Sequence, residues 1–141
     1  MANVVKVGRD VIPPVELSRG MGTRYNVCQE TVGTELLRIG VCHHAPDMAD
    51  MTWEGRCEEA FYVAKGSIKV LWENDRGERG EVVAREGEQL YLPKGNRYTL
   101  RATGEPAVNV FAIAGPPTHL TALKAGEASR LVKAAAAALH P

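Results

Sequence analysis

Short runs of alternating apolar and polar residues fill the middle of the chain, and glycine, proline or charged residues separate them. Side chains of a strand alternate between two faces, so such runs are typical of antiparallel sheets with one buried face. Helical periodicity is absent from these runs. The pattern predicts an all-β sandwich or barrel. The expected strands, about eight in number, cover residues 23–29, 35–41, 60–63, 67–73, 80–85, 89–92, 97–101 and 108–113.

The two ends of the chain differ from this pattern. Residues 1–33 include an Ile-Pro-Pro-Val run, which is extended because a residue before proline avoids the α region, and they predict an N-terminal arm or edge strands. Residues 34–116 should hold the barrel. Residues 117–141 are rich in alanine, the best helix former, and predict a C-terminal α-helix. With 141 residues, these three segments are expected to form a single domain.

Charge and hydropathy exclude several classes of function. The 17 basic and 17 acidic residues balance, so no strong field attracts the protein to nucleic acid or to anionic lipid. No apolar run reaches the roughly 20 residues of a membrane span, and the first residues lack the layout of a secretory signal. The three cysteines have no paired spacing and suit free thiols. A cytoplasmic protein without nucleic-acid or membrane partners is expected.

Two stretches of the chain carry a recognisable motif. Residues 87–98 read GEQLYLPKGNRY, a strand that ends in a Pro-Lys-Gly turn, where proline fixes φ and glycine takes a conformation that other residues resist. Upstream, Glu59 and Gly66 have six residues between them. Both stretches resemble the two motifs of the cupin superfamily, and the resemblance covers about residues 40–116. It implies a double-stranded β-helix, the cupin jelly-roll barrel.

The chain departs from the motifs at the metal ligands. In metal-binding cupins the first motif supplies two histidines and a glutamate, and the second motif supplies a third histidine. Depending on the spacing, the first two histidine positions fall on Trp53 and Gly55 or on Thr52 and Glu54. The third falls on Tyr98, so only Glu59 is retained. The resemblance therefore predicts a cupin without the usual three-histidine metal site and without a cofactor.

One branch of the superfamily shares this pattern of loss. Trp53 lies six residues before Glu59, and the Pro-Lys-Gly turn follows downstream. This arrangement resembles the cupin domain of the ethanolamine-utilisation protein Q family. The resemblance implies a small dimeric cytosolic cupin that is linked to catabolism of ethanolamine or a similar amine. We therefore expect a homodimer that binds a small polar metabolite in its barrel, whether or not it is an enzyme.

Glu59 and Tyr98 are the candidate catalytic residues. A carboxylate inside a barrel is costly unless it is partnered, so Glu59 is the expected acid, base or cation partner, although it could equally serve the barrel structure alone. Tyr98 could donate its hydroxyl to a ligand or to Glu59, or simply pack in the barrel wall. The full set of candidate ligand-binding residues is Trp53, Glu54, Glu59, Tyr91 and Tyr98.

Two alternatives remain open at this stage. Cys42, His43 and His44 are adjacent, and because neighbours on a strand point to opposite faces, at most one of the histidines faces the lumen, with Cys42 on the face of His44. A substitute site for Fe, Mn, Ni or Zn, in a metal-dependent dioxygenase, isomerase or decarboxylase, would combine His43 or His44 with Glu54, Glu59 and Tyr98. The second alternative is a non-catalytic assembly module with a closed barrel and a C-terminal helix that serves oligomerisation.

Overall fold

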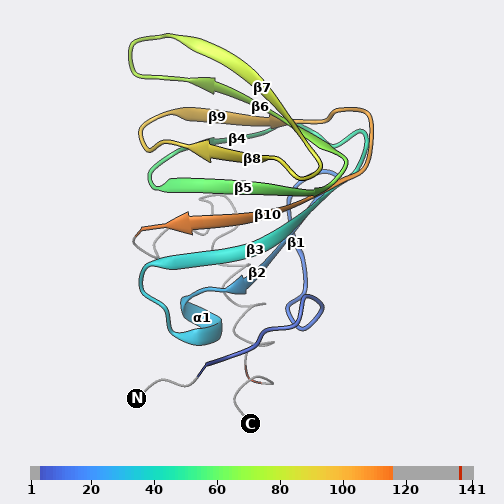
Figure 1. Cartoon of the computed structure of the whole chain (residues 1–141), viewed down its shortest axis with the longest axis vertical. Coiled ribbons are helices and arrows are strands. Elements are labelled where there is room, and N and C mark those ends of the chain that lie inside the picture. Colours follow the sequence, from blue (N-terminus) through green and yellow to red (C-terminus); the bar gives the residue numbers. More distant parts are fainter. Residues whose placement is uncertain (1–3, 116–136, 138–141) are drawn as a thin grey trace.

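Two antiparallel β-sheets face each other in the computed structural model, which describes residues 4–115 and residue 137 (Figure 1). The described residues contain ten strands and one short helix. In chain order they are β1 (Val15–Ser18), β2 (Met21–Val27), α1 (Gln29–Val32), β3 (Leu37–His44), β4 (Met51–Glu54), β5 (Glu58–Lys65), β6 (Ser67–Glu73), β7 (Arg79–Arg85), β8 (Gln89–Leu92), β9 (Arg97–Arg101) and β10 (Ala107–Ala114).

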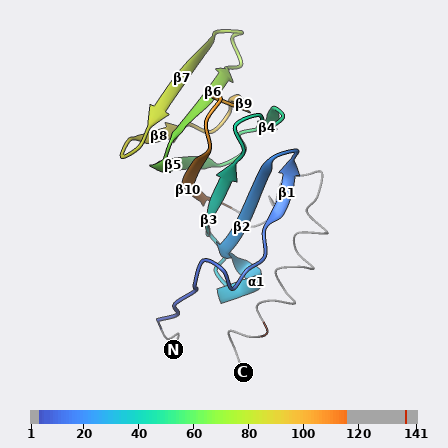
Figure 2. The same ribbon diagram turned by 90° about the vertical axis from the view of Figure 1, so that its right-hand side faces the viewer.

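The strand order is that of a jelly roll. The larger sheet has the order β1-β2-β3-β10-β5-β8, and the smaller sheet has the order β4-β9-β6-β7. Every pair within them is antiparallel. Figure 2 shows that the larger sheet extends beyond the smaller one, with β1 and β2 far from β6 and β7. The all-β jelly-roll prediction is confirmed.

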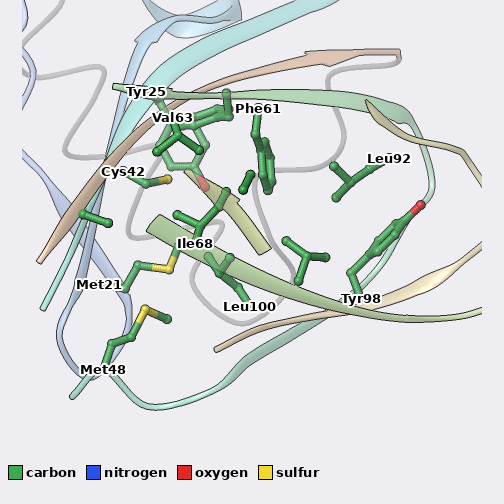
Figure 3. Packing of buried hydrophobic residues seen from close by; sticks show 14 of the residues in the cluster. Met21, Tyr25, Cys42, Met48, Phe61, Val63, Ile68, Leu92, Tyr98 and Leu100 are labelled. Atoms are coloured by element: carbon green, nitrogen blue, oxygen red, sulfur yellow. The ribbon is translucent and has the colours of Figure 1, made fainter. Parts of the chain in front are cut away.

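Alternation along the strands builds the core between the sheets. On β5, Glu59, Phe61 and Val63 are buried while the residues between them are exposed. Val63 and Ile68 are 0% and 1% exposed, and burial of such a side chain stabilises the fold by about 1.5–3 kcal/mol. Figure 3 shows these residues packed between the sheets together with Phe61 and Leu100. The same alternation brings Glu59 inside, because it shares the face of Phe61.

The predicted strands agree with the observed ones to within a few residues, and β6, β8 and β9 agree at both ends. The Pro-Pro run leads into β1, which is an edge strand of the larger sheet. Two elements differ from the prediction: β4 was not expected, and α1 begins at Gln29, where a strand was expected to end. The predicted C-terminal helix lies outside the described residues apart from residue 137. No helix in the part of the chain described here could cross a membrane.

Candidate functional site

Glu59 lies inside the barrel with an indole as its hydrogen-bond donor. The residue is 8% exposed, and Nε1 of Trp53 donates to its Oε1 at 2.9 Å. Burial raises the pKa of Glu59 above its ordinary range, while the bond from Trp53 and the charge of the buried Arg38 act in the opposite direction. Desolvation is the larger effect, so the carboxyl holds its proton to a higher pH than a solvated glutamate.

Trp53 and Tyr98 are cross-strand neighbours in the smaller sheet. Trp53 of β4 is paired with Tyr98 of β9, and the ring centroids are 5.4 Å apart with an interplanar angle of 36°. Tyr98 is 2% exposed, and its hydroxyl donates to the carbonyl of Pro93 in the turn between β8 and β9. Burial raises the pKa of Tyr98, so the phenol stays protonated at neutral pH. The Pro-Lys-Gly turn thus holds the phenol in place.

The structure decides between the two placements of the lost histidines. Gly55 is buried, and a Cβ on it would lie 2.6 Å from Cε2 of Tyr98. Trp53 and Gly55 therefore occupy the inward positions beside Tyr98. Thr52 and Glu54 are exposed. Any side chain at position 55 would collide with the phenol, so the glycine is what leaves room for the Tyr98 ring.

The remaining candidate residues lie outside this group. Glu54 faces away from the barrel and is paired with Arg97, with Oε1 and Nε 3.7 Å apart and both side chains 62% exposed. Adjacent residues alternate in direction, so Glu54 cannot join Glu59 while Trp53 points inward. Tyr91 is 64% exposed on β8, and its hydroxyl donates to Glu58 at 2.5 Å. The structure brings together Trp53, Glu59 and Tyr98, and leaves Glu54 outside.

The substitute metal site is not assembled. His44 faces inward and His43 is half-buried on the other face, as the alternation predicts. On β3, however, the residue in register with Glu59 is Arg38, because both residues pair with Ile113 of the intervening strand β10. His44 is six residues further along, and at about 3.3 Å per residue this is roughly 20 Å away. Along the register, neither histidine is level with Glu59, and the combination of a histidine with Glu59 and Tyr98 stays a prediction.

The donor atoms around Glu59 do not fit a cupin metal either. Its neighbours are an indole N–H, which is a donor, and a phenol whose hydroxyl is already bonded to a carbonyl. Within residues 4–115, no three or more histidine, cysteine, aspartate or glutamate residues are grouped so that they could hold a metal ion. Transition metals in such barrels require several imidazole or carboxylate ligands. We therefore derive no chemistry through a metal at this position.

A pocket of about 350 Å³ opens where the outer strands of the two sheets meet. Such a volume is at the lower end of small-molecule sites. Tyr98, whose ring contacts Trp53, and Leu92, the register partner of Glu59, are among its walls. The sequence did not single out Trp72 or Asn96, which come from β6 and from the turn after β8. The residues that line the pocket are Val70, Trp72, Val82, Leu90, Tyr91, Leu92, Pro93, Asn96 and Tyr98.

Among solved structures, the chain is similar to oxalate decarboxylase from Bacillus subtilis. The structure of that enzyme at pH 4.6 matches with a TM-score of 0.73 and 20% identity, over 86% of this chain and 31% of that chain. A point mutant of the same enzyme matches with a TM-score of 0.74 and 18% identity, over 86% and 32%. The chain thus spans about a third of the length of these proteins.

No protein-family model matches the sequence, and no curated protein does. The similarity to oxalate decarboxylase therefore concerns the fold. It agrees with the strand order, so the barrel has the jelly-roll fold that the sequence predicts.

Proposed function

We propose that this cupin barrel binds a small organic amine, of the ethanolamine class, in the pocket beside Tyr98. The observation that carries the proposal is the chemistry of the pocket wall. Three of its lining residues, Trp72, Tyr91 and Tyr98, are aromatic, and none of the described residues that line it is basic. Aromatic rings attract ammonium groups by about 0.5–2 kcal/mol each, and such cages recognise organic cations.

Charges near the pocket favour the same ligand. Glu58 accepts the hydroxyl of Tyr91, and Glu59 lies behind Tyr98 on the same strand as Glu58. The charged form of Glu59 would repel an anionic ligand and attract a cation. The bound cation would in turn favour the charged form of Glu59, whose pKa burial raises. Glu59 acts in this proposal as a counter-charge and not as a metal ligand.

A pair of probes of equal shape tests the charge preference. Choline carries a positively charged quaternary nitrogen where 3,3-dimethylbutan-1-ol carries a neutral carbon. The difference between their affinities therefore measures the contribution of the charge. We expect choline to bind at least about 10-fold more tightly, the effect of roughly 1.4 kcal/mol of cation–aromatic attraction. Isothermal titration calorimetry at constant ionic strength gives both constants. Equal affinities, or no binding of either probe, would contradict the proposal.

Two exposed tyrosines provide the matched variants. Tyr91 lines the pocket, whereas Tyr62 of the neighbouring strand β5 is 44% exposed and does not line it. Tyr91→Leu should weaken choline binding about 3-fold to 10-fold and leave the neutral probe nearly unchanged. Tyr62→Leu should change neither. An equal loss in both variants would point to a general effect on the barrel and would count against this pocket.

A decarboxylase is the second candidate, because the similar solved structures are oxalate decarboxylases. In that case the substrate would be a carboxylic acid. Release of carbon dioxide from oxalate by the protein, without binding of choline, would favour this candidate over amine binding.

We also propose that the chain forms a homodimer. Four strands, β1, β8, β4 and β7, end the two sheets, and exposed strand edges are commonly covered by association. The outer face of the larger sheet also exposes Leu37 and Tyr62 at 46% and 44%. Light scattering at micromolar concentration should give twice the chain mass of 15.3 kDa. A mass near that of one chain would contradict the dimer.

A further inference from the structure

Sulfur and imidazole groups meet at the end of the core that lies far from Tyr98. Met21, His44 and Met48 are 3%, 7% and 4% exposed, and we call them the Met-His cluster. Met21 of β2 is the register partner of His44 of β3. Nδ1 of His44 lies 3.1 Å from Sδ of Met48. Figure 3 shows Met21 and Met48 at one end of the core and Tyr98 at the other.

Asn109 fixes which nitrogen of His44 carries the proton. Nε2 lies 2.5 Å from Oδ1 of Asn109, a carbonyl oxygen that can only accept, so Nε2 is the protonated nitrogen. Burial lowers the pKa of His44, which keeps the ring neutral. Nδ1 therefore presents a lone pair to the thioether of Met48, which has no proton to donate. Two electron-pair donors face each other in a site closed to solvent.

We propose that the Met-His cluster binds one soft monovalent cation, Cu(I) or its analogue Ag(I), through Nδ1 of His44 and the thioethers of Met21 and Met48. Thioether and imidazole ligands suit Cu(I). Metal bonds of about 2.0 Å to nitrogen and about 2.3 Å to sulfur place the two donor atoms roughly 3–4 Å apart for bond angles of about 90–120°. The 3.1 Å between Nδ1 of His44 and Sδ of Met48 lies at the short end of this range. Asn109 is then the outer partner that orients the imidazole ring.

The surroundings favour a singly charged ion. The nearby thiol of Cys42 is already bonded to the hydroxyl of Thr23, with Sγ and Oγ1 3.4 Å apart, so it is not counted among the ligands. Three neutral ligands leave the full charge of the ion buried, which is far more costly for a divalent cation than for a monovalent one.

Backbone bonds hold Met48 against the cluster. The amide of Ala45 donates to the carbonyl of Gly20 at 2.7 Å, and the amide of Ala49 donates to the carbonyl of Arg19 at 2.8 Å. The segment that carries Met48 is thus tied on both sides to the turn that precedes Met21. The ligand geometry is set by the fold before any ion binds, as a preorganised site requires.

Competition with a coloured Cu(I) chelator tests the proposal on the full chain under anaerobic conditions. We expect one equivalent of Cu(I) per chain, bound at least 10-fold more weakly after Met48→Leu or Met21→Leu. Met51→Leu is the matched control, because Met51 is a half-buried methionine outside the cluster, and it should leave affinity unchanged. Cys42→Ala should also retain the ion and so separates this site from thiol binding.

Three outcomes would overturn the proposal: no Cu(I) retained against the chelator, equal loss in Met51→Leu, or loss confined to Cys42→Ala. Nitrogen-15 NMR of the histidine ring provides a second measurement that needs no metal. The expected tautomer has its proton on Nε2 of His44, and a proton on Nδ1 would contradict the site. The melting temperature of each variant shows whether it folds. None of these measurements depends on amine binding, so the two proposals succeed or fail separately.

Discussion

Gly40→Ala is expected to cost at least about 3 kcal/mol of unfolding free energy, because the new methyl group has no space. A Cβ at this position would lie 1.9 Å from the carbonyl oxygen of Arg24 and 2.7 Å from Cζ of Phe111. The first atom belongs to the backbone of the neighbouring strand β2, which cannot rotate away as a side chain can. Urea denaturation followed by circular dichroism measures the loss.

Gly22→Ala is the matched control for this experiment. Gly22 is also a strand glycine, on β2, but the nearest atom to its added Cβ is Cβ of Pro14 at an ordinary 3.5 Å. We expect a change below about 1 kcal/mol in either direction. A similar loss of unfolding free energy in both variants would contradict this explanation. It would mean that Gly40 is not required by the close approach of β2 and β3.

The strands were predictable wherever alternation and turn residues agreed. β8 and β9 alternate in burial, and turns that contain glycine or proline flank β6, β8 and β9, so the ends of these strands follow from the sequence. β4 was missed because it is four residues long and alternates only between half-buried and exposed positions. It forms because β9 offers hydrogen-bonding partners to it, from Met51 opposite Leu100 to Glu54 opposite Arg97. Such pairing depends on tertiary contact and leaves little trace in the local pattern.

The candidate site was predictable in part. The motif spacing identified Glu59 and Tyr98, but it left two positions open for each of the first two histidines. The inward direction of Trp53 and the buried position of Gly55 decide between them. Trp72 and Asn96 were missed because they come from elements distant in sequence that meet at the pocket. Alternation predicted that His44 shares the face of Cys42. Its distance from Glu59 depends on the register across β3, β10 and β5, which no single-strand pattern contains.

Trp53→Phe is expected to reduce the unfolding free energy at neutral pH by about 2 kcal/mol through loss of the bond to Glu59. The indole N–H is a donor to a buried carboxylate, and without it the charged form is left less well solvated. The loss should depend on pH. At low pH Glu59 is protonated in the folded and in the unfolded chain. The indole of Trp53 then donates to a neutral carboxyl group, and loss of this hydrogen bond costs less unfolding free energy.

The sign of this pH dependence follows from the pKa of Glu59. Because burial raises that pKa in the folded state, the stability associated with Glu59 is fully present below the ordinary value of 4.5 and is lost as pH rises through the folded value. Removing the Trp53 donor raises the folded pKa further. Both stability curves should therefore fall together above about pH 4.5 and diverge once the pH passes the folded pKa of Glu59 in the wild type, where the wild-type curve levels off first.

Glu59→Gln separates the hydrogen bond from the charge. The amide keeps an oxygen that can accept from Nε1 of Trp53, but it does not ionise, so the variant should be more stable than the wild type near pH 7. Adding Trp53→Phe to it should then cost the same at every pH, about 1 kcal/mol for a bond between neutral groups together with the smaller ring. Thermal unfolding of the four proteins between pH 4 and pH 8 measures this cycle. Parallel curves for the wild type and Trp53→Phe would mean that the indole does not stabilise a charged Glu59, and the carboxyl would then lose its part as the counter-charge for an amine.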